Sequence, residues 1–178
     1  VVDDKKELRI NSPFMKALIR GEYSYATIPA SIIKTIHRYL PSLVPMDKKY
    51  AKRTNNNFMF DVKVTDTELF RKLFYIPIDM KMQSTLHGYF NDREEQLRIE
   101  GFFPYLIYKG TQYESASLLC ENPSDQFRCH LRGSILMESG AMLNVSLNAN
   151  AEQDCLKTVL NWSNNTNVTY SGQLATKA

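Results

Sequence analysis

Residues 134–148, SILMESGAMLNVSLN, decide the fold, because two apolar runs flank the turn residues Ser139 and Gly140. In the second run, apolar and polar residues alternate strictly from Leu143 to Asn148. A period of two is typical of a β-strand that buries one face and exposes the other. The stretch therefore predicts a β-hairpin with one buried face.

The same period extends over much of the chain before this hairpin. One strand is predicted within residues 7–25, a second at 58–64, and from residue 82 the strand signal dominates. Turn-rich residues at 91–95 and the pair Lys109-Gly110 separate these later strands. We therefore expect a mostly antiparallel sheet.

Three segments predict helices. In TIPASIIKTIHRYL, residues 27–40, apolar side chains recur every four positions, with Thr27 as the cap and Pro29 in the first turn. The segments at 65–74 and 148–162 predict two further helices, and the polar residues 163–178 predict a flexible tail. The expected fold class is α+β: a mostly antiparallel β-sheet with two to three packed α-helices, in a single domain of residues 1–178.

Composition is that of an ordinary globular domain, with 178 residues, 43% hydrophobic and 23% charged. No apolar stretch approaches the ~18–20 residues needed to span a bilayer, and we expect neither a transmembrane helix nor a signal peptide. Residues 1–90 hold 15 of the 22 Lys and Arg but only 9 of the 19 Asp and Glu. The two halves thus carry opposite charge, which can orient one copy on another or on an acidic partner.

No motif for catalysis is present. The chain lacks a nucleophile elbow, a phosphate-binding loop and a zinc-protease helix, and we expect no enzyme, no metal site and no cofactor. His37 falls on the polar side of the first predicted helix, while His87 and His130 fall in predicted strands. A cryptic enzyme that uses His87 or His130 stays open as an alternative.

Three cysteines, Cys120, Cys129 and Cys155, match no zinc-binding spacing. The favoured interpretation is free buried thiols in a reducing compartment. The alternative is an exported, glycosylated binding domain in which Cys120 and Cys129 form a disulfide. Glycosylation sequons begin at Asn144, Asn161, Asn164 and Asn167, and we interpret them as chance occurrences in an Asn-rich region.

A basic loop is the strongest candidate for binding a partner. It contains Lys48, Lys49, Lys52 and Arg53, to which Lys5, Lys6 and Arg9 could add. Such residues neutralise the phosphates of RNA or of anionic lipid head groups. Just upstream, Leu43, Val44 and Met46 offer apolar groups to a bilayer or to a neighbouring subunit.

The order of segments resembles that of rhabdovirus matrix proteins over about residues 8–148. The similarity rests on ASIIKTIHRYL, FMFDVKV, LHGYF, PYLIYKGTQYESASL and RGSILMESGAMLNVSLN. The chain has the size of the shorter matrix proteins of plant-infecting members. It departs from the animal-virus pattern because it lacks a long Lys-rich amino-terminal tail and a PPxY or PTAP budding motif.

The resemblance implies a non-enzymatic virion scaffold with a matrix-like fold. Such a protein would self-associate head to tail, condense the helical nucleocapsid and link it to the anionic inner leaflet of the viral envelope during assembly and budding. The expected locations are the virion beneath the envelope and the host cytoplasm and membranes. The implied self-association site is Leu43, Val44, Pro45 and Met46, and the implied membrane or nucleocapsid site is Lys48, Lys49, Lys52, Arg53, Lys5 and Lys6.

Overall fold

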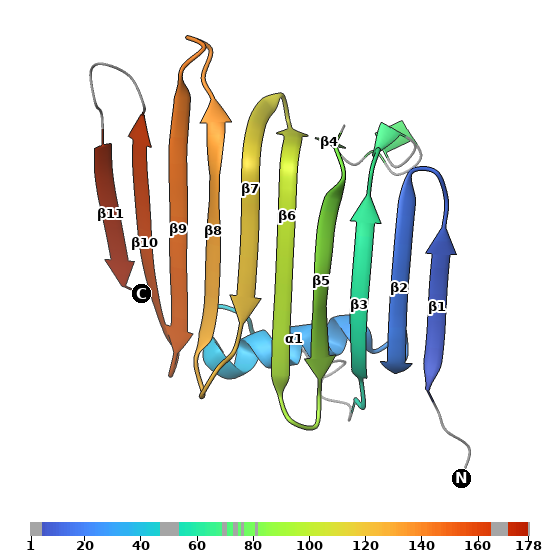
Figure 1. The fold of residues 1–178 in the computed structure, drawn as a ribbon. Coiled ribbons are helices and arrows are strands. Elements are labelled where there is room, and N and C mark those ends of the chain that lie inside the picture. The colour runs from blue at the N-terminus through green and yellow to red at the C-terminus, as the bar shows by residue number, and fades with distance from the viewer. Residues whose placement is uncertain are drawn as a thin grey trace.

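The computed structural model describes residues 5–46, 54–68, 71–72, 75, 77–80, 82–164 and 171–177. In these residues, eleven strands form one antiparallel sheet, with one twelve-residue helix packed on it (Figure 1). In chain order the elements are β1 (Lys6–Asn11), β2 (Met15–Glu22), α1 (Ile28–Tyr39), β3 (Asn57–Val64), β4 (Ile78–Asp79), β5 (Ser84–Asn91), β6 (Gln96–Tyr108), β7 (Thr111–Glu121), β8 (Phe127–Leu136), β9 (Met142–Glu152), β10 (Cys155–Asn164) and β11 (Ser171–Lys177).

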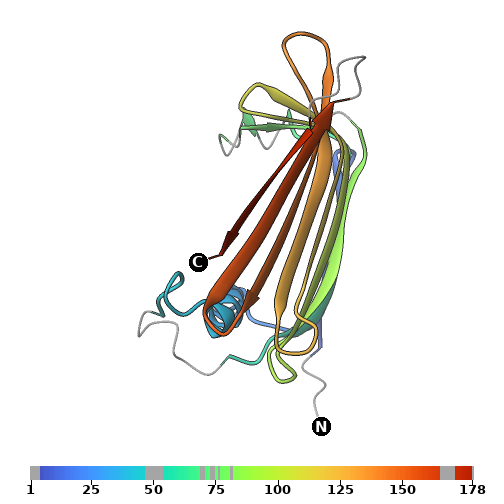
Figure 2. The ribbon, with the colours of Figure 1, turned by 90° about the vertical axis from the view of Figure 1, so that its left-hand side faces the viewer.

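The sheet is an up-and-down meander. Each strand pairs with the next strand along the chain, except that β3 pairs with β5 and the short β4 pairs with β6. Seen edge-on, the strands run side by side, and α1 lies against one side of the sheet near one end of the strands (Figure 2). The β6–β7 hairpin bends toward that same side at the other end.

Pairing register sorts the side chains onto two faces. A row of aligned positions that crosses ten strands is apolar throughout: Ile10, Ala17, Val62, Leu86, Gly101, Leu118, Leu131, Leu147, Leu160 and Leu174. The adjacent row is mostly polar: Asn11, Lys16, Lys63, Thr85, Phe102, Ser117, Arg132, Ser146, Asn161 and Gln173. Because successive residues of a strand point to opposite sides, the sheet has an apolar face and a polar face.

Helix α1 covers only one end of the apolar face. Near its start, Ile28 packs against a buried cluster of Tyr23, Phe58, Phe90 and Leu97. Near its end, Tyr39 and Leu40 form a second buried cluster with Ala151 of β9, and Phe127 and Leu156 pack against this cluster. The remaining rows of the apolar face have no such cover among the described residues.

A buried polar network fixes the start of α1 to the sheet. Asn56, which is 1% exposed, donates from Nδ2 to Ser31 Oγ at 2.7 Å, and its Oδ1 accepts from the Ser24 backbone N–H at 2.9 Å. Asp92 Oδ2 accepts from Ser31 Oγ and from the Asn56 backbone N–H, both at 2.9 Å. Because these buried groups are paired, the helix can lie directly on the sheet at Ser31, which is fully buried.

The other end of α1 is tied to the β9–β10 turn. Asp154 accepts from the Ser42 backbone N–H at 3.0 Å and from Ser42 Oγ at 2.5 Å, and its own N–H donates to the Tyr39 carbonyl at 3.0 Å. The hydrogen bonds from Ser42 lower the pKa of the Asp154 carboxyl below its ordinary value. Because both ends are bonded to the sheet, α1 is a fixed part of the fold.

The predicted fold class was wrong in its helix content. The segment 148–162, predicted as a helix, is the end of β9, a turn at Gln153 and Asp154, and most of β10. Both turn residues have positive φ values, 49° and 60°, as a two-residue hairpin connection requires. The apolar residues of β10 satisfy helical spacing as well, but Leu156 and Leu160 pair across the sheet with Ala151 and Leu147.

Three further differences add strands. Residues 7–25, predicted to contain one strand, contain most of β1 and all of β2, which turn back on each other at residues 12–14. Residues 171–177, predicted to belong to a flexible tail, form β11 and pair with β10. The predicted helix at 65–74 falls partly outside the described residues, of which Glu68, Arg71 and Lys72 are helical. The helix at 27–40 is confirmed, although Thr27 makes no side-chain capping bond.

Candidate functional site

An apolar pocket of about 310 Å³ lies on the uncovered part of the apolar face. It is formed by the four long central strands β6, β7, β8 and β9. Its lining residues are Phe103, Leu106, Tyr108, Tyr113, Ala116, Leu118, Leu131, Arg132, Gly133, Ile135, Val145 and Leu147. The volume is at the lower end of the range of small-molecule sites.

Small residues and a bulge make the pocket hollow. The pairing register of β7 and β8 shifts between Glu114 and Ser117, where Ser115 adopts a positive φ of 50°. Such a bulge bends the strand locally. Beside it, a Cβ atom added to Gly133 would lie 3.1 Å from the Cα and 3.2 Å from the Cβ of Ala116. A larger residue at Gly133 would therefore occupy the pocket.

The pocket offers very few polar groups. Only Tyr108, Tyr113 and Arg132 among its lining residues have polar side-chain atoms. The Arg132 guanidinium donates from Nε to Ser117 Oγ at 3.0 Å, on the polar face. Outside the bulge at Ser115 and Ala116, the backbone groups of these strands are used in pairing with their neighbours. The site can therefore bind a ligand by apolar contact, and has little capacity to satisfy a ligand's hydrogen bonds.

Exposed apolar residues lie in the pocket and again at both edges of the sheet, with the buried residues Ala17 and Gly101 between the pocket and the β1 edge. Leu131, in the pocket, is 45% exposed, while Ile10 on β1 and Leu174 on β11 are 36% and 54% exposed. These residues belong to one aligned row across the sheet. Exposed apolar side chains grouped at a hollow, as at Leu131, are typical of a site that binds a partner or a ligand.

A disulfide lies between the pocket and the helix-covered core. Cys120 of β7 and Cys129 of β8 are aligned partners in the sheet and form a disulfide bond. The favoured prediction of free thiols was therefore wrong for these two residues, and the alternative pairing is the one observed. Cys155 is a half-buried free thiol.

The predicted self-association segment lies at the end of α1, away from the pocket. The Val44 N–H donates to the Leu40 carbonyl at 2.9 Å, and its carbonyl lies 2.7 Å from His37 Nδ1. Val44 and Met46 are half-buried, whereas Leu43 is 57% exposed and Pro45 is exposed. Of the four predicted residues, these last two are the ones open to a partner.

The predicted basic site cannot be assembled from the described residues. Lys48, Lys49, Lys52 and Arg53 lie outside them. Lys5 and Lys6 are exposed at the start of β1, where Lys6 Nζ donates to the Tyr23 carbonyl at 3.0 Å. The proposal that these six residues share one surface stays a prediction.

His87 and His130 lie on open surfaces, whereas His37 is half-buried and lines a separate hollow beside α1. His87 Nε2 is 3.5 Å from Glu100 Oε2, and its side chain is 52% exposed. His130 Nδ1 is 2.6 Å from Asn148 Oδ1 on the exposed polar face. Neither histidine lines a described pocket, so the deep site that the cryptic-enzyme alternative requires is not found around them in the described residues.

The apolar pocket was missed by sequence reasoning, although a signal for it exists. Every strand of the hairpin region alternates apolar and polar residues, which demands a cover for a wide apolar face. One helix of twelve residues is too short to cover that face, since it spans about 18 Å while ten strands span over 40 Å. The excess of apolar strand positions over helix surface is thus the signal.

Comparison of the chain with protein-family models, with curated proteins and with solved structures finds no match. In the described part of the chain, no helix has the length and apolar character to cross a membrane.

Proposed function

We propose that this chain is an exported binding domain whose apolar pocket takes up a long alkyl chain, such as the acyl chain of an amphipathic lipid. The observation that carries the proposal is the uncovered pocket on β6–β9, whose side chains are almost all apolar. Each methylene group that enters it leaves water, which contributes about 0.8 kcal/mol. The polar head of the ligand would stay outside, in solvent.

The scarcity of polar groups favours an alkyl chain over a peptide. A bound peptide would bring backbone N–H and C=O groups that lose their water, and leaving them unpaired costs about 1–3 kcal/mol each. The pocket has almost no group to pair with them. An alkyl chain has no such groups.

The disulfide supports the export part of the proposal. Disulfides form and persist in oxidising compartments and are rare where glutathione keeps thiols reduced. The Cys120–Cys129 bond staples β7 to β8, the two strands that carry most of the pocket lining. An exported domain with a Cys120–Cys129 disulfide is the alternative that the sequence left open, and alkyl-chain binding does not depend on glycosylation.

The test is binding of a fluorescent C18 fatty acid to the purified, disulfide-intact protein. We expect saturable binding with increased emission, and the Leu131→Glu variant should bind at least about tenfold more weakly, because a carboxylate beside an alkyl chain loses hydration. Leu131 is already 45% exposed, so the variant should fold.

Leu136→Glu is the matched control. Leu136 belongs to the same strand, is 37% exposed and does not line the pocket. The affinity of the Leu136→Glu variant for the probe should stay within about twofold of the affinity of the unsubstituted protein. Absence of saturable binding, or equal loss in both variants, would refute the proposal.

Self-association is a second proposal, favoured by the exposure of Leu43. A leucine with 57% of its surface exposed, next to the exposed Pro45, is suited to docking in a neighbouring subunit. The virion-scaffold function, with its nucleocapsid and membrane partners, depends on such association and stays a prediction.

Leu43→Ser should weaken self-association about tenfold, because the docked leucine contributes about 1.5–3 kcal/mol. Sedimentation over a hundredfold range of concentration measures it. Met59→Ser is the control, since Met59 is equally exposed at 58% but lies in β3. A monomer at every concentration would exclude the scaffold function.

A further inference from the structure

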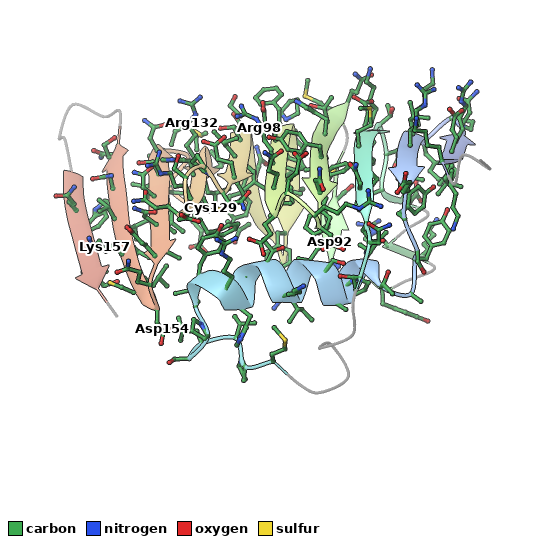
Figure 3. All side chains as sticks on the ribbon, turned by 90° about the horizontal axis from the view of Figure 1, so that it is seen from below. Asp92, Arg98, Cys129, Arg132, Asp154 and Lys157 are labelled. Atoms are coloured by element: carbon green, nitrogen blue, oxygen red, sulfur yellow. A yellow bond between two sulfur atoms is a disulfide. The ribbon has the colours of Figure 1, made fainter. Side chains whose placement is uncertain are left out.

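A second hollow, of about 750 Å³, lies on the polar face of the sheet over β7–β11. Its polar lining side chains are hydroxyl, amide and guanidinium groups. They include Arg132, Ser134, Asn144, Ser146, Asn161 and Gln173. This surface is on the side of the sheet opposite the apolar pocket, as Arg98 and Arg132 show by pointing away from α1 in Figure 3.

The groups of this hollow form a hydrogen-bonded row with donors left over. Gln173 Nε2 donates to Asn161 Oδ1 at 3.0 Å, and Asn161 Nδ2 donates to Ser146 Oγ at 3.4 Å. Among the bonds between described residues, Arg132, in the same row, donates only from Nε. An arginine has five N–H donors and an amide has two, so the row presents further donors to solvent.

Three cations on the same strands stand outside the ion pairs of the described residues. Arg128 and Arg132 lie on the same face of β8, about 14 Å apart, and the register partner of Arg128 on β7 is Glu121. Lys157 of β10 lies in the register row of Arg128. Within the described residues, Arg128, Arg132 and Lys157 form no ion pair, although Arg20 and Arg98 elsewhere on this face pair with Glu7 and Glu121.

We infer that this polar face binds an acidic polysaccharide. Unpaired guanidinium and ammonium groups match carboxylate, sulfate or phosphate groups that recur along a chain. Hydroxyl and amide side chains between them match the hydroxyl groups of sugars. The one aromatic residue among the described lining residues, Trp162, is half-buried, and its register places its side chain on the apolar face, so this surface lacks the exposed aromatic platforms on which single-stranded nucleic acids stack their bases.

The probe is dextran sulfate, compared with neutral dextran and with poly(A) RNA, by isothermal titration of the full chain at 50 and 150 mM salt. Dextran sulfate should bind at both salt concentrations, and neutral dextran should not. Arg132→Gln should weaken binding about tenfold through the lost charge. Asn161→Leu should weaken it about threefold through lost hydrogen bonds, an effect that general attraction between charges would not produce.

Lys63→Gln is the matched control, because Lys63 lies in the same register row of the polar face, on β3, far from the hollow. It should change the affinity by less than twofold. Tighter binding of poly(A) than of dextran sulfate would assign the face to nucleic acid and overturn the inference. Equal losses in Lys63→Gln and Arg132→Gln, or no effect of Asn161→Leu, would also overturn it.

Discussion

Phe90→Ala should lower the free energy of unfolding by about 3–5 kcal/mol. Phe90 is 2% exposed, and its ring centroid lies 5.8 Å from that of Phe58 in the cluster on which α1 begins. Truncation removes a buried aromatic ring and leaves a cavity between two strands and the helix. Urea denaturation followed by circular dichroism measures the change.

Phe102→Ala is the control for this prediction. Phe102 is 47% exposed on the polar face of β6, and its truncation should change the free energy of unfolding by less than about 1 kcal/mol. If both variants lost equal stability, the core would not lie on the face that α1 covers. The difference between them therefore tests the assignment of the two faces.

Local periodicity was enough to predict most of the strands. The hairpin at 134–148, the strand at 58–64 and the turns at 91–95 and Lys109-Gly110 all agree with the structure. In the strands on either side of these turns, apolar residues repeat every two positions, which fits a strand and does not fit a helix. Helix α1 was equally predictable, since its apolar residues repeat every four positions between two prolines.

Local periodicity failed where one pattern fits two structures. In β10, the pairs Cys155-Leu156 and Val159-Leu160 satisfy helical spacing, while Leu156, Leu160 and Trp162 alternate as a strand requires. The segment forms a strand because it pairs with β9 on one side and β11 on the other. This pairing cannot be deduced from the residues of β10 alone. Tertiary context overrides propensity in such segments.

The candidate site was less predictable than the fold. The apolar pocket gathers residues from four strands, and the polar hollow on the other face from five, so both depend on register. A shift of one residue in any strand would exchange the two faces. The sequence shows that each strand has two kinds of face, but only the aligned strands show where apolar positions remain uncovered.

Asn56→Ala should lower the free energy of unfolding by about 3 kcal/mol. The substitution leaves the Ser24 N–H without its acceptor, and Ser31 Oγ, which still donates to Asp92 Oδ2, loses the donor Asn56 Nδ2 in the junction between α1 and the sheet. Each buried polar group left unpaired costs about 1–3 kcal/mol. The same denaturation experiment measures the effect.

Asn55→Ala supplies the control, because the neighbouring Asn55 is exposed and accepts only from Arg93 Nε among the described residues, at 2.8 Å. It should alter stability by less than about 1 kcal/mol.

Binding of the fatty-acid probe separates the role of α1 from that of the pocket. If α1 is a fixed support, Asn56→Ala should bind the probe normally while it remains folded, since no pocket residue belongs to α1. Loss of probe affinity in the folded variant would instead mean that the helix moves to cover the bound chain.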